Sequence, residues 1–182
     1  MVKPALALYR FQTMGELRAL LALYRIGVEE LQGTRAGRPY HGLVYTVLDE
    51  NGEKAPVTLL KASSLGDDAS LKKVETILAS SPEKINSANL HKMILHHVEE
   101  ALIESLSEEE LCKRLKTHHI DLFLRRNDQN RITGVTFIDH ENRCVLNGYR
   151  LGKRYSANAF NERFGKTMKK ETSTKKILTR KL

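Results

Sequence analysis

The chain has 182 residues, enough for one ordinary domain or two small ones, and its 41% hydrophobic content excludes an intrinsically disordered protein. Its net charge is +8, no apolar run approaches the roughly 20 residues of a membrane-spanning helix, and the N-terminus lacks a signal-peptide pattern. Two cysteines, Cys112 and Cys144, are too few for a disulfide framework or a structural zinc finger. We therefore expect a soluble cytoplasmic protein that does not associate with membranes.

Residues 13–70 and 107–156 follow the same plan, which indicates an internal repeat. Each copy opens with a capping box, in which a hydroxyl accepts from the backbone three residues later and a carboxylate reaches back. The two boxes are Thr13 with Glu16 and Ser107 with Glu110. A helix follows in each copy, and the first is predicted to end at Gly27 because glycine readily adopts a left-handed conformation.

Three antiparallel strands follow each helix. Alternating apolar residues predict strands at 28–32, 42–45 and 57–62 in the first copy, and at 120–125, 134–137 and 144–147 in the second. Residues that favour turns separate them, at 33–37, 51–52, 127–130 and 141–142.

Each copy closes with the pattern Leu-Gly-x-x-x-Ser, at Leu65–Ser70 and at Leu151–Ser156. Both serines can cap a further helix, expected at 71–79 and 157–164. Residues 80–84 are predicted to form a loop and the start of a helix. A longer helix over 88–104 should pack through Leu90, Met93 or Ile94, His97 or Val98, and Leu102.

The predicted fold class is therefore α+β. Two pseudo-repeated units of helix, three-stranded antiparallel sheet and helix (5–79 and 107–165) are joined by a linker loop and helix (80–106). A basic flexible tail (166–182) follows them.

The residues predict no catalytic site, no metal and no cofactor, because the chain has no phosphate-binding Gly-rich loop with a following Lys and no paired-His metal motif. His96–His97 and His118–His119 are adjacent pairs whose members point to different sides of a helix, so neither pair readily shares a metal ion. We interpret them as surface or partly buried polar residues. A regulatory enzyme without a recognisable active site stays as a minor hypothesis.

The main functional signal lies at 147–156, where cations alternate with aromatic residues. From 143 to 165 the chain has five basic residues and one acid. Cations mixed with aromatics suit single-stranded nucleic acid, and the helix start at Ser156 would attract an anion. Gly148 and Gly152 would let the backbone approach a ligand. The candidate contacts in this region are Arg143, Tyr149, Arg150, Lys153, Arg154, Tyr155, Ser156 and Arg163.

An alternative is that Leu151-Gly152 only forms a structural corner, since Leu65-Gly66 occurs in the first copy without this charge. We interpret the corner as structural and its basic residues as functional. The tail from Lys166 to Leu182 adds seven basic residues against one acid, and Lys166, Lys169 and Lys170 are candidate phosphate contacts. It could equally be a solubilising terminus or the start of a longer segment.

Two strings, from Gly134 to His140 and from Asn147 to Phe164, closely resemble the C-terminal region of relaxase/mobilisation proteins. These proteins act on plasmids and integrated mobile elements of gut bacteria. The strings Tyr9–Leu21 and Gly42–Tyr45 resemble the segment after the nuclease domain in the same family, and the resemblance covers about residues 5 to 165.

Members of that family nick one DNA strand at a transfer origin, using an N-terminal domain with a metal-binding histidine cluster and a nucleophilic tyrosine. These 182 residues contain no His-x-His motif and no stretch that resembles that nuclease domain. The resemblance therefore implies a segment that follows the nuclease domain and acts in DNA transfer without nicking. No catalytic residue is carried over.

Two functions follow as expectations. In the first, the chain is a DNA-binding module that helps to hold single-stranded or hairpin transfer-origin DNA. In the second, it is a protein-interaction module that docks the relaxase to relaxosome accessory proteins or to the coupling ATPase, through the exposed edges of its sheets.

Overall fold

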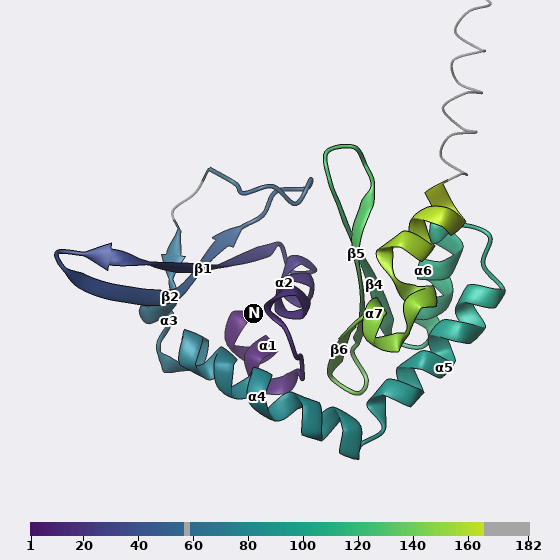
Figure 1. Ribbon diagram of the computed structural model, residues 1–182, viewed down its shortest axis with the longest axis horizontal. Coiled ribbons are helices and arrows are strands. Elements are labelled where there is room, and N and C mark those ends of the chain that lie inside the picture. The colour runs from purple at the N-terminus through teal and green to yellow at the C-terminus, as the bar shows by residue number, and fades with distance from the viewer. Residues whose placement is uncertain (57–58, 166–182) are drawn as a thin grey trace, which may run out of the picture. The chain divides into compact units, whose positions relative to one another are not determined.

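The computed structural model describes residues 1–56 and 59–165 (Figure 1). The chain divides into two compact units, of which the first comprises Met1–Leu90 and Asn142–Val145 and the second the other described residues. The predicted α+β class is confirmed: there are two three-stranded antiparallel sheets, each flanked by helices, with helices between them in the chain. No helix within the described ranges is long and apolar enough to cross a membrane.

The order of elements is the same in the two halves of the chain. The first half contains α1 (Val2–Leu8), α2 (Met14–Ala22), β1 (Ile26–Arg35), β2 (Arg38–Val47), β3 (Leu60–Lys61), α3 (Ala62–Leu65), the short 3-10 helix η1 (Asp67–Ala69) and α4 (Leu71–Ser87). The second half contains α5 (Leu90–Ile103), α6 (Glu108–Thr117), β4 (Ile120–Arg126), β5 (Ile132–Asp139), β6 (Cys144–Asn147), α7 (Gly148–Leu151), the 3-10 helix η2 (Lys153–Tyr155) and a helix over 157–165. The structural repeat thus begins one helix earlier than the capping boxes predicted.

The first capping box forms as predicted, but the helix after it is shorter. Thr13 Oγ1 accepts from Glu16 N, and the Glu16 carboxylate accepts from Thr13 N, both at 3.1 Å. Helix α2 ends at Ala22, and Arg25, not Gly27, adopts the left-handed conformation, with φ 56°. Gly27 lies in β1, where a Cβ would come within 2.7 Å of the Thr46 side chain, so close packing requires the glycine there.

Strands β1 and β2 form a long hairpin whose register pairs Ile26 with Val47 and Arg35 with Arg38. Ala36 and Gly37 form its turn with positive φ at both positions, as a two-residue hairpin turn of type I′ requires. The predicted core residues Leu43 and Tyr45 are each 2% exposed. In Figure 1 the outer half of the hairpin extends away from α1 and α2 of its own unit. The third strand is shorter than predicted, and residues 57–58 lie outside the described ranges.

The second sheet, with strand order β4-β5-β6, follows the predicted strands closely. Phe137 of β5 is buried against Phe160, and Phe160 packs edge-on against Phe164, so the helix over 157–165 covers this part of the sheet. Helix α5 buries Ile94 in preference to Met93 and Val98 in preference to His97. Its sequence periodicity had left both choices open.

The predicted loop at 80–84 is wrong, because α4 runs without interruption from Leu71 to Ser87 with Pro82 inside it. A proline in a helix interior removes one backbone hydrogen bond and costs about 3 kcal/mol in an isolated helix. Val74, Ser81 and Ile85 are nevertheless each at most 1% exposed along one face of α4. Burial of this face holds residues on both sides of Pro82 in one helix.

Tyr45 provides a test of the first unit's core. Its hydroxyl donates to Ala69 O at 2.8 Å, and burial raises the pKa of Tyr45 from 10.0 to about 12. Because this pKa is higher in the folded state, the neutral side chain stabilises the fold below pH 10, and that stability is lost as the pH rises towards 12. Tyr45→Phe should therefore lower the free energy of unfolding by about 1 kcal/mol at pH 7. It should also reduce the further loss of stability that the wild type shows at alkaline pH.

Urea denaturation at pH 7 and pH 11 checks this expectation. Tyr40→Phe is the matched control, since the Tyr40 side chain is 50% exposed. If the free energy of unfolding falls by the same amount between pH 7 and pH 11 in Tyr45→Phe and in the wild type, the assigned role of the Tyr45 hydroxyl is contradicted.

Candidate nucleic-acid interface

The basic segment lies on a backbone motif that occurs twice. We call residues 61–70 the first corner and residues 147–156 the second corner. Each has a four-residue helix, a glycine with positive φ (88° at Gly66, 134° at Gly152), a three-residue 3-10 helix and a serine with φ −73°. Ser70 and Ser156 then cap α4 and the helix over 157–165, as predicted.

Packing inside the second corner requires Gly148. A Cβ at this position would lie 2.1 Å from Tyr155 O and 3.2 Å from the Val135 Cβ. The Asn147 side chain accepts from Tyr149 N at 2.9 Å and so caps α7. The small size of Gly148 therefore serves contact with the chain's own backbone.

The outer surface of the second corner is cationic and aromatic. The Tyr149 side chain is 68% exposed, and Arg150, Lys153 and Arg154 are exposed beside it. His91 of α5 donates from Nε2 to Arg150 O at 2.6 Å, which ties the corner to that helix. Within the described part of the chain, neither Lys153 nor Arg154 forms an ion pair with a carboxylate.

The first corner has the opposite character on the same backbone. Ser63 and Ser64 stand where the second corner has Tyr149 and Arg150, and Asp67 and Asp68 stand where it has Lys153 and Arg154. Both 3-10 helices precede a helix N-terminus, where acidic residues stabilise the helix and basic residues destabilise it. Helix stability thus explains the aspartates of the first corner but not the cations of the second.

A groove of about 450 Å³ lies beside the second corner, entirely within the second unit. Asn161 fixes its geometry, because its side-chain amide exchanges hydrogen bonds of 3.0 and 2.7 Å with the backbone of Ile132 on β5. The groove is lined by Arg131, Thr133, Gly134, Tyr149, Ser156 and Asn158, among others. It therefore joins the exposed tyrosine to the start of the helix over 157–165.

Of two arginines that were not among the predicted contacts, Arg131 lines this groove, and Arg125 contacts residues of its lining. Arg131 donates to Asn158 Oδ1 at 3.0 Å. Arg125 is paired across the strands with Gly134 and donates to Thr133 Oγ1 at 3.2 Å. Both flank the predicted turn at 127–130, and the strand pairing brings them to the same end of the hairpin.

Three of the predicted contacts have partners within the fold. The Tyr155 ring is only 3% exposed and its hydroxyl donates to Glu99 at 2.8 Å. Burial, together with that hydrogen bond, raises the pKa of Tyr155 to about 12. Arg163 donates to Ser105 O at 3.0 Å, beyond the end of α5. Arg143 groups with the first unit, where it donates to the Tyr9 hydroxyl at 3.0 Å.

The structure therefore brings Tyr149, Arg150, Lys153, Arg154 and Ser156 together at one corner. Lys166, Lys169 and Lys170 lie outside the described residues. Comparisons of the chain with protein-family models, with curated proteins and with solved structures find no match in any of the three.

Proposed function

We propose that this chain is a non-catalytic DNA-binding module of a relaxase/mobilisation protein, which helps to hold transfer-origin DNA in the cytoplasm. The second corner is its principal contact. The observation that supports this role most strongly is the contrast between the two corners, which share a backbone but differ in charge at three exposed positions and in aromatic character at a fourth.

The chemistry of the corner suits a single strand. Exposed bases stack on aromatic rings, and Tyr149 offers such a ring. A neighbouring phosphate would meet Lys153 and Arg154, which no described carboxylate neutralises. It would also meet the first-turn amides after Ser156, because a helix N-terminus has unpaired N–H groups and a partial positive charge. Arg131 and Arg125 would extend the cationic surface along the groove.

Salt dependence of binding tests the assignment. We expect the triple variant Arg150→Ala, Lys153→Ala and Arg154→Ala to bind single-stranded DNA more weakly in fluorescence anisotropy. Its plot of log K against log salt should be flatter by about two units, because each lost phosphate contact on a single strand removes roughly 0.7.

The matched control removes three exposed lysines of the first unit, Lys61, Lys72 and Lys84, and so changes the net charge equally. It should change the slope much less. Unchanged affinity and slope in the triple variant of the second corner would remove the site assignment.

A second candidate function, docking of a protein partner, is favoured by an apolar groove of about 730 Å³ in the first unit. Val47 and Leu60 in its lining are 52% and 44% exposed. Leu60 also lies on β3, at an edge of the first sheet, where an incoming strand could pair. The partner would be a relaxosome accessory protein or the coupling ATPase, contributing an apolar segment.

The two functions respond to different substitutions. If the groove docks such a partner, Val47→Asp should abolish saturable binding to it and leave DNA affinity unchanged. Pull-down and titration with each relaxosome protein would measure the effect, and equal partner binding by Val47→Asp and wild type would exclude this surface.

A further inference from the structure

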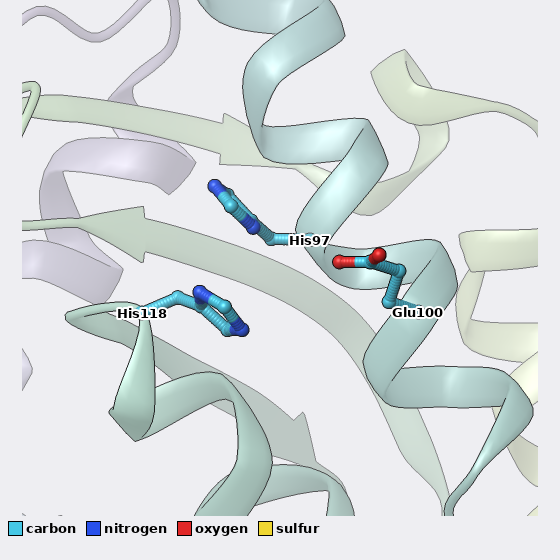
Figure 2. A group of neighbouring side chains, drawn as sticks. All are labelled: His97, Glu100 and His118. Carbon is cyan, nitrogen blue, oxygen red and sulfur yellow. The ribbon is translucent and has the colours of Figure 1, made fainter.

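Three side chains of metal-binding type meet in the second unit, apart from the nucleic-acid interface. They are His97 and Glu100 on α5 and His118 at the end of α6, and one ligand atom of each lies within 4.8 Å of those of the other two. Figure 2 shows His97 and Glu100 projecting from the same side of α5, with the His118 ring facing them.

Local structure accounts for this meeting. Positions three residues apart lie on the same face of a helix, so His97 and Glu100 are neighbours on α5. His118 caps the C-terminus of α6, where its backbone N donates to Leu115 O at 3.0 Å. Each adjacent histidine pair therefore contributes one member to the cluster. The two members of one adjacent pair do not meet in the cluster.

The cluster contains a polar atom that lacks a hydrogen-bond partner. Nδ1 of His97 is buried and, among the described residues, finds neither a donor nor an acceptor. Most buried polar atoms in proteins are paired, and leaving one unpaired costs about 1–3 kcal/mol. The rings of His97 and His118 are stacked, with centroids 4.3 Å apart and planes 21° from parallel.

Two imidazoles and a carboxylate form a ligand set typical of Zn²⁺ sites that keep a fourth position for water. Bonds of about 2.0–2.1 Å to the metal would bring the ligand atoms to about 3.3 Å from one another. The stacked rings must therefore turn for their lone pairs to converge. The Glu100 carboxylate is exposed, with His96 Nε2 3.6 Å from it, and His118 is half-buried, so both side chains have room to move.

We propose that His97, Glu100 and His118 form a binding site for a divalent transition-metal ion of the Zn²⁺ type, with solvent as the fourth ligand. The ion would link α5 to the end of α6 inside the second unit. It would also supply the partner that the buried Nδ1 of His97 lacks. This site does not depend on the proposed DNA binding.

Isothermal titration with Zn²⁺ tests the site, using the full chain without a histidine tag and after treatment with chelator. The wild type should bind one equivalent saturably. His118→Asn should weaken binding at least tenfold, whereas His119→Asn, which removes an imidazole from the exposed neighbouring position, should not. Titration with Co²⁺ in place of Zn²⁺ gives a second readout. The strong visible absorption of tetrahedrally coordinated Co²⁺ should develop in the wild type and not in His118→Asn.

Circular dichroism of each variant checks that it is folded, and Glu100→Gln provides a second substitution, at an exposed position. Equal loss of affinity in His118→Asn and His119→Asn would overturn the proposal. So would the absence of saturable Zn²⁺ binding in the wild type, or full affinity in both His118→Asn and Glu100→Gln.

Discussion

Gly148→Ala is expected to lower the free energy of unfolding by about 3 kcal/mol, the upper end of the usual cost of inserting one methyl group into a packed site. The added Cβ would lie 2.1 Å from a backbone oxygen, that of Tyr155, which cannot move away as a flexible side chain could. Relief requires the whole second corner to shift. Urea denaturation followed by circular dichroism measures the loss.

Gly42→Ala is the matched control, because a Cβ on Gly42 would meet nothing within 4 Å. Its effect should stay within about 0.5 kcal/mol, as for most surface substitutions. A loss of less than 1 kcal/mol in Gly148→Ala would show that α7 and η2 do not pack as described.

Giving the second corner the residues of the first should abolish most DNA binding without unfolding the protein. The variant carries Tyr149→Ser, Arg150→Ser, Lys153→Asp and Arg154→Asp, each the residue at the equivalent first-corner position. Loss of one stacked base and of three cations should weaken single-strand affinity by roughly 100-fold or more at low salt. Fluorescence anisotropy measures this change.

The same variant should be more stable than the wild type, although it binds DNA more weakly. Aspartates before the helix over 157–165 would favour its N-terminus by about 0.3–1 kcal/mol each. A fall in DNA affinity together with a rise in the free energy of unfolding distinguishes the loss of a DNA contact from damage to the fold. The reverse change, Asp67→Lys with Asp68→Arg, should lower stability slightly by the same reasoning. Affinity at the wild-type level in the four-residue variant would contradict the proposed contact.

Local signals predicted most of the fold. Thr13 and Ser107 cap helices because short-range hydrogen bonds decide such ends, and these can be read from neighbouring residues. Period-two alternation placed Leu43 and Tyr45 in the core for a similar reason. Prediction failed where distant packing outweighed local preference, as at Pro82, whose helix is held by buried residues on both sides.

The candidate site was less accessible to sequence reasoning. The charge and aromatic content of residues 147–156 could be read directly from the sequence, but which of these side chains are buried could not. Tyr155 resembles Tyr149 in sequence, yet it is buried and hydrogen-bonded to Glu99 of a distant helix. Arg131 reaches the groove through the register of β4 and β5 and through Asn158. The meeting of His97 with His118 likewise depends on how α5 and α6 pack.

The central claim is that the second corner contacts DNA, and an NMR titration of the full chain with a single-stranded oligonucleotide tests it most directly. The amide signals of residues 147–158 should shift first and saturate together, while those of the equivalent residues 61–72 stay unchanged. Saturable shifts confined to other parts of the chain, with residues 147–158 unaffected, would contradict the claim.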